Sequence, residues 1–186
     1  MTSALATRVA APRRPAPQAI DFRPYRDLAA SGTQAQALAR RFERANLLLM
    51  AAVEQYPDAL WRAEVARGGQ SAAAETFHVA QQQPLLASFI QAVASGRPLP
   101  RLDDSGGHAA AGLPTLPTRL ALLELLRRNG RLSADIIAGL SDAQLGRATS
   151  YFGVTLTAAQ LVDELLIGHL DEHGARLQAC GCARGA

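Results

Sequence analysis

The sequence TAAQLVDELLIGHLDEHGARLQA, residues 157–179, predicts an amphipathic helix with two histidines on its apolar face. It begins with a capping box, in which the Thr157 hydroxyl accepts from the Gln160 backbone and the Gln160 side chain accepts from the Thr157 backbone. Positions four residues apart are neighbours on a helix surface. One such row is apolar, apolar, His, His, apolar: Leu161, Leu165, His169, His173 and Leu177.

The two histidines of this row are expected to project towards the protein interior. Buried polar groups need partners, and neutral imidazole is a common ligand of divalent metals. A metal ion shared by His169 and His173 is therefore one interpretation of the pair. The other is a pair of partly exposed histidines, with His173 stabilised near the helix end by the helix dipole.

A third histidine, His78, belongs to a separate predicted helix. It shares a stripe with Ala74, Leu85 and Phe89, so it also faces inward. Taken alone, it could be a buried histidine bonded to a backbone carbonyl. With three of the four histidines on core stripes, a three-histidine metal site is favoured. Three protein ligands leave coordination positions open, as in catalytic rather than structural sites.

Two acidic residues are candidates for holding the histidines in place. Glu75 lies one turn before His78, and Glu172 directly precedes His173. A carboxylate often accepts the second ring N–H of a ligand histidine. Each acid also has an ordinary alternative, because Glu75 suits the first turn of a helix and Glu172 could belong to a solvated acidic face.

Three further segments have helical periodicity: residues 33–55, 71–95 and 118–139. Ser71 is a good N-cap for the second, Pro84 should kink it, and Asn129-Gly130 could bend or split the third. Aromatic residues make up only 5% of the chain, and runs of β-branched residues are missing, which disfavours sheets. Four helices of roughly 20 residues predict an all-α four-helix bundle.

We expect three parts in the chain: a poorly ordered N-terminal arm over residues 1–30, the bundle over residues 31–180 and a tail over residues 181–186. The arm carries five arginines and two aspartates, so the net charge of +3 lies there and the body is neutral. A neutral body lacks the basic surface of a nucleic-acid-binding protein, so nucleic acid is not expected as a partner.

Composition excludes several other classes of protein. All 19 basic residues are arginine, which excludes a P-loop lysine and any lysine Schiff base. No apolar run approaches about 18 residues, so no membrane helix is expected. The two cysteines, Cys180 and Cys182, are too close together to join distant segments. A reducing, cytoplasmic location is the default for such a chain.

Two segments resemble signature motifs of the DinB/YfiT-like superfamily. Residues 68–84, GGQSAAAETFHVAQQQP, resemble its W-S-x-x-E-x-x-x-H helix entry. Residues 140–179, LSDAQLGRATSYFGVTLTAAQLVDELLIGHLDEHGARLQA, resemble its connector and H-x-x-x-H helix. The first motif departs from the usual form, because Gln70 stands where Trp is common and one extra residue separates Ser71 from Glu75. The resemblance covers about residues 33–180.

The resemblance implies a DinB-like four-helix bundle that binds one divalent ion through His78, His169 and His173. The ion is often nickel, zinc or iron in this superfamily, and dimers are frequent, so a homodimer is implied. Relatives include bacillithiol-dependent S-transferases and mycothiol-dependent maleylpyruvate isomerases. A low-molecular-weight thiol is therefore a candidate cosubstrate.

An open three-histidine site could act on a small-molecule substrate in two ways. A metal-bound water that loses a proton near neutral pH would make the protein a hydrolase. An ion that binds and deprotonates a thiol would make it an S-transferase. The non-enzymatic alternative is a metal-binding or stress-response bundle in which the metal is structural or sensory.

Overall fold

The computed structural model describes residues 33–63, 70–99 and 116–183 of the 186-residue chain, although only the backbone of residues 181–183. The chain divides into residues 1–30 and residues 31–186. The expected N-terminal arm, residues 1–30, therefore lies outside the described residues. No helix in the described part is long and apolar enough to cross a membrane.

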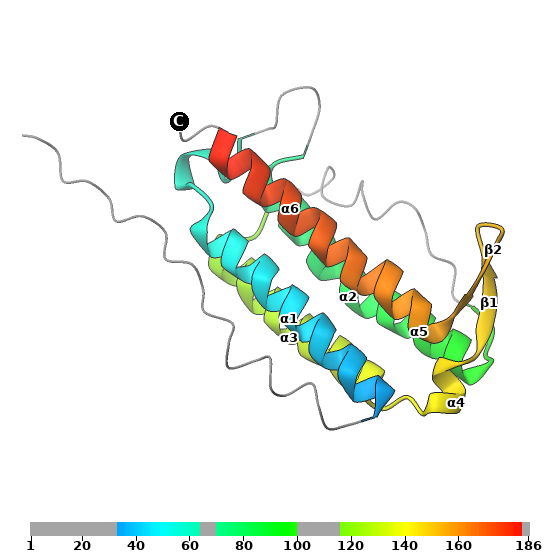
Figure 1. The fold of residues 1–186 in the computed structure, drawn as a ribbon. Coiled ribbons are helices and arrows are strands. Elements are labelled where there is room, and N and C mark those ends of the chain that lie inside the picture. Colours follow the sequence, from blue (N-terminus) through cyan, green and yellow to red (C-terminus); the bar gives the residue numbers. More distant parts are fainter. Residues whose placement is uncertain (1–32, 64–69, 100–115, 184–186) are drawn as a thin grey trace, which may run out of the picture. The chain divides into compact units, whose positions relative to one another are not determined.

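Four long helical segments make up most of the described structure (Figure 1). Three are single helices: α1 (Gln34–Gln55), α2 (Ala72–Ser95) and α3 (Arg119–Ala138). The fourth is formed by consecutive segments: α5 (Ala158–Leu161), η5 (Val162–Ile167) and α6 (Gly168–Ala183). Short elements lie between them: η3 (Asp58–Leu60), α4 (Asp142–Leu145), β1 (Ala148–Tyr151) and β2 (Val154–Thr157).

The predicted helix starts are confirmed by their capping hydrogen bonds. The Ser71 side chain accepts from the Ala74 backbone N–H at the start of α2. Thr157 and Gln160 form the predicted capping box at the start of α5. These bonds satisfy backbone N–H groups that have no partner within the helix. The sequence therefore predicts correctly the residue at which each of these two helical segments begins.

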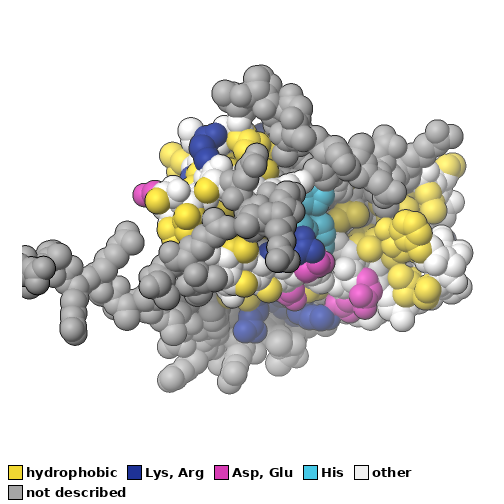
Figure 2. Space-filling model, turned by 90° about the horizontal axis from the view of Figure 1, so that it is seen from above, with side chains coloured by type: hydrophobic (Ala, Val, Ile, Leu, Met, Phe, Trp, Pro, Cys, Tyr) yellow, Lys and Arg dark blue, Asp and Glu magenta, His cyan; other side chains and the backbone are white. Residues whose placement is uncertain are grey.

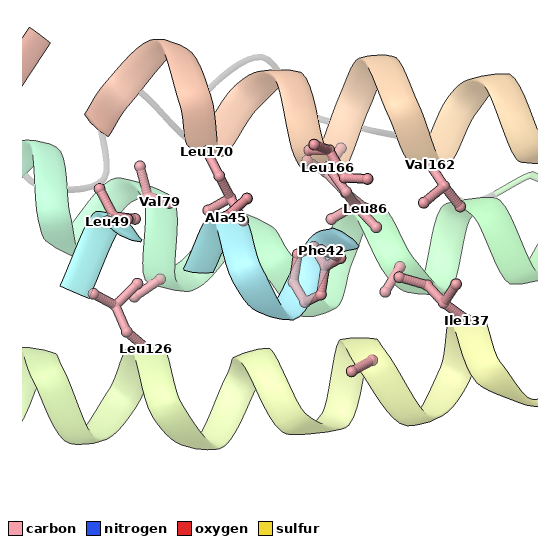
Figure 3. Packing of buried hydrophobic residues seen from close by; sticks show 14 of the residues in the cluster. Phe42, Ala45, Leu49, Val79, Leu86, Leu126, Ile137, Val162, Leu166 and Leu170 are labelled. Carbon is pink, nitrogen blue, oxygen red and sulfur yellow. The ribbon is translucent and has the colours of Figure 1, made fainter. Parts of the chain in front are cut away.

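The helices pack around one apolar core (Figure 3). Helix α3 packs against α1 and α2, and α6 packs against α1 and α2. Every long segment contributes buried side chains to this core, including Phe42 and Leu49 from α1, Val79 and Leu86 from α2, Leu126 and Ile137 from α3, and Leu166 and Leu170 from the fourth segment. Each such side chain contributes about 1.5–3 kcal/mol by leaving water. The predicted four-helix bundle is thus confirmed.

Helix α3 is continuous through Asn129 and Gly130, so the predicted split does not occur. The pair instead serves packing. A Cβ at Gly130 would overlap the side-chain amide of Asn46 on α1, and this amide donates to the Leu126 carbonyl at 3.2 Å. Asn129 Nδ2 donates to the Ala80 carbonyl of α2 at 2.7 Å. The two residues therefore join α3 to both neighbouring helices.

The connector before the last helix contains a β-hairpin that the sequence analysis did not predict (Figure 1). Strands β1 and β2 are antiparallel, and their register pairs Tyr151 with Val154. Phe152 and Gly153 form the two-residue turn with positive φ values of 47° and 80°, the geometry of a type I′ turn. The Tyr151 ring lies 5.8 Å from the ring of Phe89, which attaches the hairpin to α2.

The end of the last helix also differs from expectation. Helix α6 continues to Ala183, so the predicted tail of residues 181–186 is helical over residues 181–183. Of the two cysteines, Cys180 is free, and the side chain of Cys182 lies outside the described part.

Candidate metal centre

The three predicted histidines meet between two helices of the bundle. His78 comes from α2, and His169 and His173 come from α6. One ring nitrogen from each lies within 4.8 Å of the other two. The ring centroids are 4.3 Å apart for His169 and His173, and 5.3 and 5.4 Å for the pairs that include His78. Histidine side chains reach the surface beside charged residues (Figure 2), so the cluster is accessible from solvent.

A π-helical turn precedes the two histidines on the last helix. Segment η5 ends where the backbone N–H of Gly168 donates to the Asp163 carbonyl, five residues earlier. The extra residue shifts the apolar face, so that Leu166 is 1% exposed while Leu165 is only partly buried. Leu165 of the predicted row still packs against the core, but it is less buried than Leu166. Such turns often occur at functional sites, and here the turn sets the rotation at which α6 presents its histidines.

Glu75 holds the most buried histidine of the cluster. Its Oε1 atom lies 2.6 Å from Nδ1 of His173, whose residue is 6% exposed. Burial raises the pKa of Glu75, but the hydrogen bond and charge of His173, together with the charge of Arg176, leave the pKa below its ordinary value. The ionised carboxylate favours the proton on Nδ1. In the neutral ring of His173, Nε2 is then the nitrogen with the lone pair.

His169 combines a neutral ring with a buried ring nitrogen. Burial, and then the charges of His173 and His78, lower the pKa of His169 to about 4. The ring is therefore neutral at pH 7. Its Nε2 atom is buried and has no hydrogen-bond partner within the described structure. Buried polar atoms rarely lack a partner, and a divalent cation among three imidazoles would provide one.

Glu172 does not bond to a histidine in the described contacts. Its exposed carboxylate forms a salt bridge with Arg176 one turn later on α6. Arg176 in turn lies 3.4 Å from Oε1 of Glu75. Glu172 is therefore connected to the histidines only through Arg176 and Glu75. The sequence analysis did not single out Arg176, although its place one turn after both Glu172 and His173 was a visible signal.

Comparisons with known proteins give matches in structure only. No family model and no curated protein matches the sequence. A DinB-like protein of Bacillus subtilis, YjoA, is similar in fold, with a TM-score of 0.57 and 17% identity over 80% of this chain and 92% of that chain.

A second similar structure is YfiT from Bacillus subtilis, described as a probable metal-dependent hydrolase with an unusual four-helix bundle topology. Its TM-score is 0.61, with 17% identity over 81% of this chain and 90% of that chain. Both matches span nearly the whole length of the known structures. This chain therefore has the fold of the DinB-like proteins, and the resemblance seen in its motifs is confirmed at the level of the fold.

Proposed function

We propose that this chain is a metal-dependent enzyme that binds one divalent ion through His78, His169 and His173 and acts on a small molecule. The observation that carries the proposal is the convergence of three ring nitrogens in a cluster where Nε2 of His169 is buried and has no partner among the described residues. The similarity of the fold to YfiT, described as a probable metal-dependent hydrolase, supports it. Nickel, zinc and iron are the candidate ions.

The protein residues would divide the work of the site. The three imidazoles are donors suited to such an ion. Glu75 fixes the ring orientation and tautomer of His173, which raises the basicity of the ligand nitrogen. His78 and His169 are only partly buried, so the open side of the cluster faces solvent, where a substrate can approach. A bound divalent ion supplies a Lewis acid and can lower the pKa of a water ligand to about 7.

Hydrolysis is the reaction type that we favour. The group of potential ligands found among the described residues consists of three histidines without a cysteine, so we expect the nucleophile to come from solvent or from a cosubstrate. Solvent water corresponds to a hydrolase, and a low-molecular-weight thiol corresponds to the S-transferase that the sequence motifs also suggest. We further propose that the protein works in the cytoplasm, the default for its cysteine usage, and that it forms a homodimer, as the resemblance implies.

Two assays on the metal-loaded chain test the enzymatic proposal. The first follows hydrolysis of a panel of activated esters, amides and phosphate esters. The second follows conjugation of a small thiol to an electrophile. Activity in either assay that requires the metal and is lost in His169→Gln supports an enzyme and selects the reaction. A chain that binds the metal but gives no activity in either assay would support the structural or sensory alternative.

A further inference from the structure

A cavity of ≈ 290 Å³ lies at the end of the bundle where α1 ends and α2 begins. Its apolar wall is formed by side chains from α1, α2 and α6, including Tyr56, Ala72, Leu177 and Cys180. None of the three clustered histidines lines it. The cavity therefore adjoins the candidate metal centre through Glu75 but includes none of its three histidines. Its volume is close to the lower end of the about 300–1,000 Å³ typical of small-molecule sites.

The polar edge of the cavity is formed by Gln70, Glu75 and Arg176, and the last two carry its charge. Arg176 pairs with both Glu75 and Glu172, so one guanidinium faces two carboxylates and the group as a whole carries one excess negative charge. Such an edge attracts a cation and repels an anion of the same size.

Glu75 also has unused capacity to accept hydrogen bonds. Among the contacts of the described residues, its Oε1 atom receives both His173 and Arg176, and Oε2 receives neither. A carboxylate has about four lone-pair positions on two oxygens. A ligand with an N–H donor could therefore bind this carboxylate without displacing His173.

We propose that this cavity binds a small apolar amine. The ammonium group of the amine donates to Glu75, and its hydrocarbon part contacts Tyr56, Leu177 and Cys180. A single aromatic or alicyclic ring with one aminomethyl group fits the chemistry of the lining. The proposal does not depend on the metal, because the cavity and its charge are present in the metal-free chain.

Three probes with the same ring and different head groups test the proposal: benzylamine, benzyl alcohol and benzoate. Each is titrated into the metal-free full-length chain, which prevents the amine from binding through a metal. The readout is calorimetric binding, together with the rate of iodoacetamide alkylation at Cys180 in a Cys182→Ser background. Benzylamine should bind saturably, slow the alkylation, and bind at least about tenfold more tightly than benzoate, since a charge-assisted hydrogen bond is lost in the acid.

Two substitutions on the exposed face of α6 form a matched pair. Ala179 lines the cavity, so Ala179→Phe should fill it and abolish protection of Cys180. Ala175 is one turn earlier, also exposed, and does not line the cavity, so Ala175→Phe should leave benzylamine binding intact. No saturable binding of any probe, equal binding of all three, or equal effects of the two variants would overturn the proposal.

Discussion

His173 on α6 and Glu75 on α2 are joined by a 2.6 Å contact between Nδ1 and Oε1, although they are 98 residues apart in the sequence. The contact links the first turn of α2 to the middle of α6. It places a carboxylate behind one of three clustered imidazoles, the arrangement by which proteins orient histidine ligands.

Removing this carboxylate should weaken metal binding without removing a ligand. Glu75→Ala is expected to reduce Zn²⁺ affinity by about 10–100-fold, the usual effect of losing such a partner. Glu75→Gln keeps an acceptor oxygen and should recover part of the affinity. Competition titration with a chromogenic chelator measures the dissociation constants.

Glu172→Gln is the matched control for Glu75, because Glu172 reaches the histidines only through Arg176. Its effect on Zn²⁺ affinity should be small. Equal losses in Glu75→Ala and Glu172→Gln would show that general negative charge, rather than the bond to His173, matters at the site.

The low pKa of His169 predicts how stability depends on pH. The folded pKa is about 4, below the ordinary value of 6.5, so between these limits the unfolded chain binds a proton that the folded chain does not. The free energy of unfolding of the metal-free chain should therefore fall as the pH is lowered from 6.5 to about 4. Glu75 acts in the same direction at the acid end, because its pKa is also lower in the folded state.

Urea denaturation at a series of pH values measures this effect. His169→Gln removes the titrating ring, so the variant should lose less stability than the parent over the same window. Parallel curves for the two proteins would mean that His169 is not held neutral by the fold.

Gly130 permits the close approach of α1 and α3, and this gives a prediction about stability. Gly130→Ala should destabilise the chain by about 1–3 kcal/mol, because its Cβ would overlap the amide of Asn46. Gly174→Ala is the control, since the nearest atom to a Cβ there is Leu49 Cδ1 at an ordinary 3.9 Å.

The control substitution should be neutral or stabilising by up to about 1 kcal/mol, the helix-propensity difference between glycine and alanine. Thermal unfolding of the two variants separates the effects. A Gly130→Ala variant as stable as Gly174→Ala would contradict the close packing at Asn46.

The hairpin turn holds Phe152 at a positive φ of 47°, with 82% of the residue exposed. Asparagine adopts this conformation more readily and is favoured before glycine in such turns. Phe152→Asn should therefore raise the free energy of unfolding by about 0.5–1 kcal/mol. Phe152→Ala serves as the control, because it removes the same ring but keeps the strain. If Phe152→Asn and Phe152→Ala lose the same amount of stability, the prediction is wrong. The contacts of the Phe152 ring would then stabilise the chain by more than the positive φ destabilises it.

The helices and the histidines could be predicted from the sequence because both depend on local periodicity. Ser71 and Thr157 mark helix starts through short-range hydrogen bonds, and His169 and His173 share a face because they are four residues apart. Their proximity to His78 could be predicted as well, because the helices of a four-helix bundle pack side by side. Glu75 could be proposed because the helix places it one turn before His78.

Other features depend on contacts that no local pattern reveals. The Asn129-Gly130 pair has the sequence of a helix break, and only its partners Asn46 and Ala80 show why the helix continues. The hairpin has strands of four residues with partly exposed side chains, too short for an alternating pattern to stand out. Segment η5 contacts both α1 and α2, and no local sequence pattern marks its π-helical hydrogen bond.

The most direct test of the metal centre is a titration of the metal-free chain with Zn²⁺ in parallel with its His169→Gln variant. We predict that the parent binds one ion per chain. The affinity of the variant should be lower by at least about 100-fold, because only two of the three imidazole ligands remain. An absence of saturable binding in the parent, or equal affinity in the variant, would contradict the assignment of the three histidines to a metal.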